Sequence, residues 1–135
     1  MQARRFAEWK PPTIRADGST KWGWQVHPRH KKKLKLGKRV DIGFGTYLQP
    51  QYGITIGDDA QIGSHCAIYS ASTIDGKHGA VHIGKSAKIG THSSIMPGVT
   101  IGEGAIIGAY SFVKSNVPAR TLAFGIPARV QKRLP

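Results

Sequence analysis

The chain has 135 residues, 39% of them hydrophobic and 8% aromatic, which is enough for one modest core with few large side chains. It contains no run of about 18 apolar residues and no apolar amino-terminal stretch of the signal-peptide kind, so we expect a cytoplasmic protein without a membrane partner. The net charge of +13 suits nucleic acid, an anionic surface or a polyanionic small molecule, and charge alone does not choose among them.

Residues 1–35 lie outside any repeat and contain three tryptophans, Trp9, Trp22 and Trp24. We expect this segment to form an irregular cap, and substrate contact is the alternative interpretation. A basic cluster covers residues 30–39. Because it lacks the interleaved aromatic residues of single-stranded nucleic-acid binders, we favour a solvated face over anion steering, and nucleic acid is the least favoured partner.

Residues 36–118 repeat with a period of six. Aliphatic residues recur at this spacing at Leu36, Ile42, Leu48 and Ile54, at Ile56, Ile62, Ile68 and Ile74, and at Ile83, Ile89, Ile95, Ile101, Ile107 and Val113. Neither a helix, with period 3.6, nor a plain strand, with period two, explains this spacing. A glycine often follows the aliphatic residue, which we interpret as a turn with positive φ.

The fourth residue after each aliphatic position is small or β-branched, as at Cys66 and Ser72, which indicates a second inward position in a narrow interior. Each six-residue unit then forms one face of a coil, and the coils stack with hydrogen-bonded strands. The pattern therefore predicts an all-β fold, a parallel β-helix of hexapeptide repeats.

The period breaks twice. Between Ile54 and Ile56 the register slips by two residues, which predicts a small bulge or a corner. Between Ile74 and Ile83 the spacing is nine, so residues 75–82 should project as a loop with three extra residues. In a solenoid such insertions gather on one face, where binding sites tend to lie.

His78 is the histidine in the middle of this loop. An imidazole titrates close to neutral pH and can take the proton of an attacking hydroxyl or amine, so His78 is our candidate general base. An exposed loop histidine without a role fits the pattern equally well. Asp75 could orient the imidazole or bind a substrate amine or hydroxyl, although Asp75-Gly76 is also common turn chemistry.

The carboxyl-terminal tail, residues 119–135, contains Gly125-Ile126-Pro127-Ala128-Arg129. Together with IGTHSSIMPGVTIGEGAIIGAYSFV at residues 89–113, this tail resembles the hexapeptide acyltransferases, among them the sugar and antibiotic O- or N-acetyltransferases such as maltose and galactoside acetyltransferase. The resemblance implies a left-handed parallel β-helix and a homotrimer with active sites between neighbouring helices. It also implies acetyl-CoA as cosubstrate, a loop histidine as general base, and a sugar or nucleotide-linked sugar as the acceptor of the acetyl group.

The same resemblance assigns the cofactor residues. Backbone groups at Thr91 and Ala109 would face the pantetheine arm of acetyl-CoA. Lys114, Arg129 and Lys132 would contact its phosphates, although Ser115 stands where relatives often have a lysine. His65, His82 and His92 are expected to pack at the trimer interface.

Two other classes compete with this reading. A γ-class carbonic anhydrase-like metalloprotein needs three histidines at one metal, but the chain lacks the five-residue histidine spacing of that class, so we expect no metal. A non-enzymatic β-helix scaffold would keep the coil without the chemistry, and the Gly-x-Pro-Ala-Arg tail and the loop argue against it.

Overall fold

The computed structural model describes residues 8–135, which form short strands, one 3-10 helix and their turns. The elements are β1 (Gln25–Val26), η1 (Pro28–Lys33), β2 (Leu34–Leu36), β3 (Asp41–Ile42), β4 (Tyr47–Gln49), β5 (Ile54–Ile56), β6 (Gln61–Ile62), β7 (Ala67–Tyr69), β8 (Ala71–Ser72), β9 (Lys77–His78), β10 (Val81–Ile83), β11 (Lys88–Ile89), β12 (Ser94–Ile95), β13 (Thr100–Ile101), β14 (Ile106–Ile107), β15 (Phe112–Val113), β16 (Thr121–Gly125) and β17 (Ala128–Arg133).

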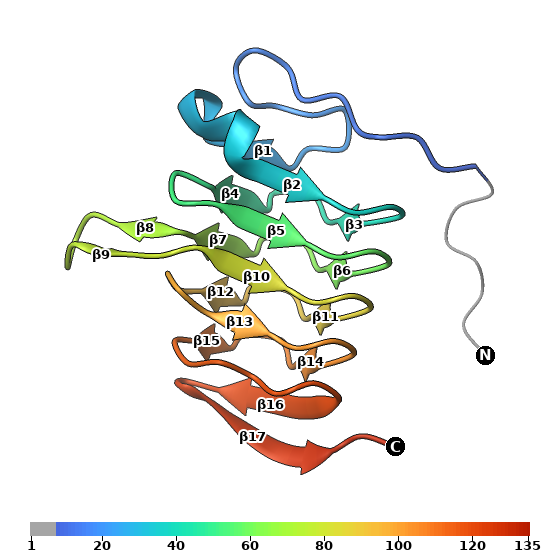
Figure 1. Ribbon diagram of the computed structural model, residues 1–135, viewed down its shortest axis with the longest axis vertical. Helices are drawn as coiled ribbons and strands as arrows, with labels where there is room; N and C mark the ends of the chain where they lie inside the picture. Colours follow the sequence, from blue (N-terminus) through green and yellow to red (C-terminus); the bar gives the residue numbers. More distant parts are fainter. Residues whose placement is uncertain (1–7) are drawn as a thin grey trace.

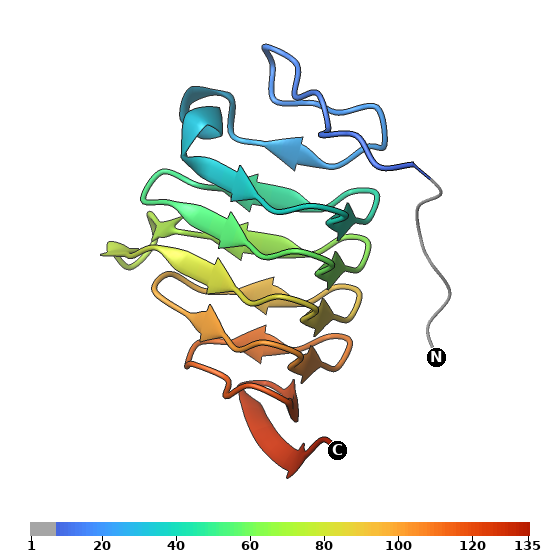
Figure 2. The same cartoon turned by 45° about the vertical axis from the view of Figure 1, so that its right-hand side comes forward.

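Three sheets wrap around the long axis of the molecule, as Figures 1 and 2 show. Sheet A contains β1, β4, β7, β12 and β15; sheet B contains β2, β5, β10 and β13; sheet C contains β3, β6, β11, β14, β16 and β17. The chain passes from sheet B to sheet C to sheet A in each coil, and the neighbouring strands of successive coils pair in parallel. This arrangement is the expected parallel β-helix.

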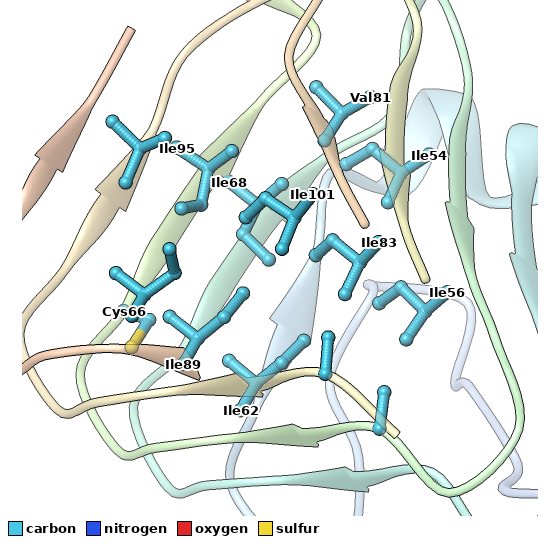
Figure 3. Close-up of a cluster of buried hydrophobic side chains, with 14 of the residues drawn as sticks. Ile54, Ile56, Ile62, Cys66, Ile68, Val81, Ile83, Ile89, Ile95 and Ile101 are labelled. Atoms are coloured by element: carbon cyan, nitrogen blue, oxygen red, sulfur yellow. The ribbon is translucent and has the colours of Figure 1, made fainter. Parts of the chain in front are cut away.

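The repeat aliphatics form the core. Their side chains point inward from all three sheets in stacked columns, part of which Figure 3 shows. The small residues at the second inward position are buried too, including Cys66, Ala87, Ser93, Ala105 and Ser111. Two predicted inward positions are wrong: Ile74 is 98% exposed and Ser72 is only half-buried, because both lie on a hairpin that leaves the coil.

Strand pairing shows where the extra residues lie. Ile83 pairs with Ile101, eighteen residues on, whereas Ile56 pairs with Ile83, 27 residues on, and Leu36 pairs with Ile56, 20 residues on. Relative to the 18-residue coil, one coil thus has two additional residues and the next has nine. Because of these insertions, the six-residue spacings of Leu48 to Ile54 and of Ile68 to Ile74 arise by chance and do not join equivalent positions of the coil.

Both predicted phase breaks are therefore displaced. Ile54 and Ile56 are neighbours on the inner side of one strand, β5, and the extra residues form the preceding turn at 50–53. The loop expected at 75–82 is instead an antiparallel hairpin of β8 and β9 that begins at Ala71. Val81 has already returned to the core, because β10 pairs with β5.

The glycines that follow the repeat aliphatics do not have positive φ, which corrects our turn interpretation. A Cβ on Gly63 would lie 2.7 Å from the backbone nitrogen of Thr91, and one on Gly90 would lie 2.5 Å from that of Ala109. Positive φ occurs two residues later, for example at His65 and at His92. The position directly after the repeat aliphatic therefore requires glycine because the backbones of successive coils are in contact there, and not because of its φ angle.

The β-helix extends beyond residues 36–118 at both ends. Val26 of β1 pairs with Leu48, and Trp24 is buried against the first coil. At the other end β16 pairs in parallel with β14, and β17 then folds back antiparallel along β16. This hairpin covers the edge that β16 would otherwise leave open to pairing with another chain.

Candidate active site

Both insertions leave the β-helix at the corner where sheet A passes to sheet B. This A–B corner consists of the turns at residues 50–53, 70–80, 96–98 and 114–116. In Figure 1 the hairpin of β8 and β9 projects from this corner, away from the turns of sheet C. The β8–β9 hairpin is the only long insertion in the described coils, and it lies at the same corner as the irregular turn at residues 50–53.

Ser70 fixes the base of the hairpin. It is buried, and its hydroxyl donates to the carbonyl oxygen of Gln49 at 2.7 Å while accepting the backbone N–H of Tyr52 at 2.9 Å. Its own carbonyl accepts the N–H of Gly79 at 2.9 Å. One buried serine thus ties the hairpin to the irregular turn of the preceding coil.

His78 lies on β9 beside that turn. Its ring stacks on the ring of Tyr52, with the ring centres 4.6 Å apart and the planes inclined by 22°. Both side chains are exposed, so the imidazole is held on one face while its edge stays open to solvent. The predicted base is accessible and restrained by two backbone segments rather than placed on a free loop.

Asp75 occupies the tip of the hairpin. Its Oδ1 accepts the N–H of Lys77 at 3.2 Å, and Gly76 has a φ of 69°, as expected for turn chemistry. Hydrogen bonds from the Ser72 side chain and then from the Lys77 backbone lower the pKa of Asp75. The carboxylate therefore stabilises its own turn, and its hydrogen bonds to Ser72 and Lys77 do not connect it to His78.

A second set of predicted residues lies at the corner where sheet C passes to sheet A, formed by residues 43–46, 63–66, 90–93 and 108–111. Here a column of rings runs along the coil axis. The ring centres of Phe44 and His65 are 5.8 Å apart, those of His65 and His92 are 5.1 Å apart, and those of His92 and Tyr110 are 4.8 Å apart. Our sequence reasoning missed this column, because its rings come from turns of successive coils that are far apart in the sequence.

Thr91 lies beside His92. The Thr91 hydroxyl donates to the carbonyl of Ser64 at 2.8 Å and lies 2.9 Å from His92 Nδ1. When the hydroxyl proton points to Ser64, a hydrogen bond between Thr91 and His92 needs the hydrogen on Nδ1, and Nε2 is then the acceptor nitrogen of a neutral imidazole.

The predicted cofactor residues fall in three places. Thr91 and Ala109 lie at the C–A corner, and Lys114 follows β15 at the A–B corner. Arg129 and Lys132 are exposed on β17, opposite Phe124 and Leu122 of β16. Within one chain, sheet A separates Thr91 and Ala109 from Lys114 and from His78.

The outer faces of the sheets carry other titratable groups. His82 is exposed on β10, between Thr55 and Thr100 of the neighbouring strands. Among residues 8–135, histidine, cysteine and carboxylate side chains form no group of three that could hold a metal ion. No helix in this part of the chain is long and apolar enough to cross a membrane.

Comparison with known proteins supports this description of the fold. Residues 80–115 match the model of the bacterial transferase hexapeptide, six repeats. A maltose O-acetyltransferase from Clostridium difficile 630 superimposes with a TM-score of 0.76 at 27% identity, over 84% of this chain and 64% of that one. The chain carries the hexapeptide repeat of bacterial transferases and resembles the hexapeptide-repeat acyltransferases in sequence and fold. Its fold is the left-handed parallel β-helix of these acetyltransferases, as the resemblance implied.

Two further similar proteins are informative. A candidate acetyltransferase of Staphylococcus aureus (strain COL) is 37% identical over 124 residues, which cover 85% of this chain and 58% of the relative. A hexapeptide-repeat acetyltransferase from Vibrio cholerae O1, solved with acetyl-CoA, has a TM-score of 0.77 at 29% identity, over 83% of this chain and 65% of that one. The chain thus spans little more than half the length of its staphylococcal relative.

Proposed function

We propose that this protein transfers an acetyl group from acetyl-CoA to a hydroxyl or amine of a sugar or nucleotide-linked sugar. The observation that carries the proposal is the restrained His78 at the interrupted corner of a left-handed β-helix. The relatives support the donor and the acceptor class, because one was solved with acetyl-CoA and another is a maltose O-acetyltransferase.

The reaction is a direct transfer. The acceptor oxygen or nitrogen attacks the thioester carbonyl while His78 takes the acceptor's proton, and the carbon–sulfur bond then breaks. The CoA thiolate then receives this proton from His78 and leaves as the free thiol. The ring of Tyr52 limits how far the imidazole can rotate, so the base stays in one orientation toward the acceptor.

We further propose a homotrimer with composite sites. Thr91 and Ala109 lie at the C–A corner, where the strands of sheet A begin, and His78 lies at the A–B corner, where these strands end. One chain therefore does not bring them together. Packing the A–B corner of one chain against the C–A corner of the next would unite them around a threefold axis. Arg129 and Lys132 would supply positive charge for the phosphates of acetyl-CoA.

The test is an assay of free thiol release from acetyl-CoA with a panel of amino sugars, neutral sugars and nucleotide sugars. We expect acceptor-dependent release, and His78→Ala should lower the turnover number by about 10²–10⁴-fold. If no acceptor in the panel stimulates thiol release, the proposed activity is wrong. If His78→Ala stays within about threefold of the wild type, the base assignment is wrong.

His92 is the rival base, because it lies at the corner that the resemblance assigns to the pantetheine arm, with its Nδ1 2.9 Å from the Thr91 hydroxyl. The variants His78→Ala and His92→Ala therefore form a matched pair. A large loss of turnover in His92→Ala alone would move the base to the C–A corner. A rise in KM for acetyl-CoA with unchanged turnover would leave His92 as a wall of the cofactor channel.

A further inference from the structure

A pocket unrelated to the candidate active site lies under the amino-terminal cap. Its volume is about 470 Å³, within the range of small-molecule sites. The floor comes from residues 36–42, which span the end of β2, the following turn and β3. The turns joining sheets B and C lie opposite the β8–β9 hairpin in Figure 1, so this cap pocket and His78 are on different sides of one chain.

The walls of the cap pocket are aromatic. All three tryptophans of the chain line it: Trp9, Trp22 and Trp24. Trp24 is buried in the core, whereas Trp22 is 53% exposed and offers a free ring surface. The ammonium group of Lys21 lies 5.9 Å from the centre of the Trp22 ring, so a cation holds one position at the rim.

The turn that presents Trp22 is held by hydrogen bonds and packing. The N–H of Gly23 donates to the carbonyl of Thr20 at 3.2 Å, and the Thr20 hydroxyl donates to the carbonyl of Trp24 at 2.7 Å. Gly23 has a φ of 90°, and the ring of Phe44 packs where its Cβ would be. A site built on such a turn is formed before its ligand arrives, which lowers the entropic cost of binding.

The rim of the cap pocket carries both signs of charge, with Lys10 and Lys21 on one hand and Glu8 and Asp41 on the other. The chain has only seven acidic residues against twenty basic ones, so two carboxylates at one rim argue against a polyanionic ligand such as CoA. Carboxylates accept and ammonium groups donate, which suits the hydroxyls of a neutral sugar.

An aromatic face is electronegative and attracts the polarised C–H groups of a pyranose ring. We propose that the cap pocket is a second, non-catalytic binding site for a neutral pyranose. The sugar ring lies against Trp22, its hydroxyls reach the charged rim, and the site works independently of the acetyl transfer proposed above.

Intrinsic tryptophan fluorescence tests this directly, because all three tryptophans line the cap pocket and no acceptor bound elsewhere would change it by contact. The full chain without acetyl-CoA is titrated with methyl β-D-glucopyranoside and methyl β-D-galactopyranoside, and binding is checked by saturation-transfer NMR. We expect saturable millimolar binding. Trp22→Ala should weaken it at least about tenfold, and Trp22→Phe should retain most of it.

Two controls make the test specific. Phe124→Ala removes another half-exposed aromatic side chain at the far end of the β-helix, and His78→Ala disables the candidate active site; both should leave the fluorescence titration unchanged. The proposal is overturned if neither sugar binds saturably, if Trp22→Ala and Phe124→Ala behave alike, or if ADP displaces the sugar signal. It is also overturned if Trp22→Ala changes the sedimentation coefficient, because the cap pocket would then be a contact between copies of the chain.

Discussion

Substituting Gly90 by alanine should destabilise the β-helix far more than its single methyl group suggests. A Cβ at Gly90 would lie 2.5 Å from the nitrogen and 2.7 Å from the Cα of Ala109. These are backbone atoms of the next coil, and the Gly90 N–H is bonded to the carbonyl of Ile107 at 2.8 Å. The two coils must separate locally, so we expect a loss of about 3 kcal/mol, at the upper end of overpacking costs, and a Tm lower by roughly 10 °C.

The matched control is Gly98→Ala. Gly98 has a φ of 80°, but a Cβ there has no atom within 4 Å, so alanine meets only the backbone penalty of about 1–2 kcal/mol. Thermal and urea denaturation followed by circular dichroism would compare the two variants at equal protein concentration. If Gly90→Ala lost no more stability than Gly98→Ala, backbone contact between coils would not be the reason for glycine after the repeat aliphatics.

Three further expectations follow from single side chains. The Arg39 guanidinium, whose Nε lies 2.7 Å from Asp59 Oδ1, lowers the pKa of this carboxyl, so the pair stabilises the fold above the unfolded pKa of about 3.9 and loses its effect as pH falls through the folded pKa. A pH series of Tm values should therefore fall less steeply below about pH 4 in Asp59→Asn, and an unchanged slope would contradict the assignment. Burial raises the pKa of the Cys66 thiol, so a thiol reagent at about pH 8 should label Cys66 only after unfolding, and rapid labelling of the folded protein would show that the thiol is accessible. Ile74→Ala should change the free energy of unfolding by less than about 0.5 kcal/mol, whereas Ile68→Ala should cost about 2–5 kcal/mol, and equal losses would return Ile74 to the core.

The core of the fold could be predicted from the sequence because its interactions repeat. Ile83, Ile89 and Ile95 occupy successive faces of one coil, so a period of six follows from three faces of six residues. The two insertions could not be placed from spacing, because an insertion can restore an apparent multiple of six. Ile74 keeps the period in sequence and yet lies on a hairpin tip, and only pairing of Val81 with Ile54 shows where the coil resumes.

The site was less predictable, because it depends on which corner each turn joins. The sequence indicated that His78 projects from the coil, but the stacking partner Tyr52 comes from the turn 26 residues earlier. The column of His65 and His92 arises because left-handed turn residues in successive coils lie above one another, although they are 27 residues apart. Neither contact leaves a local pattern in the sequence.

The separation of the two corners leads to a test of the proposed assembly. If each active site combines His78 of one chain with the C–A corner of its neighbour, then His78→Ala and a corner-blocking variant, Ala109→Trp, should each be inactive alone. When the two variants are unfolded and refolded together in equal amounts, about a quarter of the sites should combine an intact hairpin with an intact corner, and a corresponding fraction of wild-type activity should return. A site contained within one chain would recover no activity, since every chain in the mixture has one defect.

Refolded wild type sets the maximum recovery, and each variant refolded alone sets the background. Restored thiol release would therefore establish that neighbouring chains share the site, whereas background activity with fully mixed oligomers would place the whole site on a single β-helix.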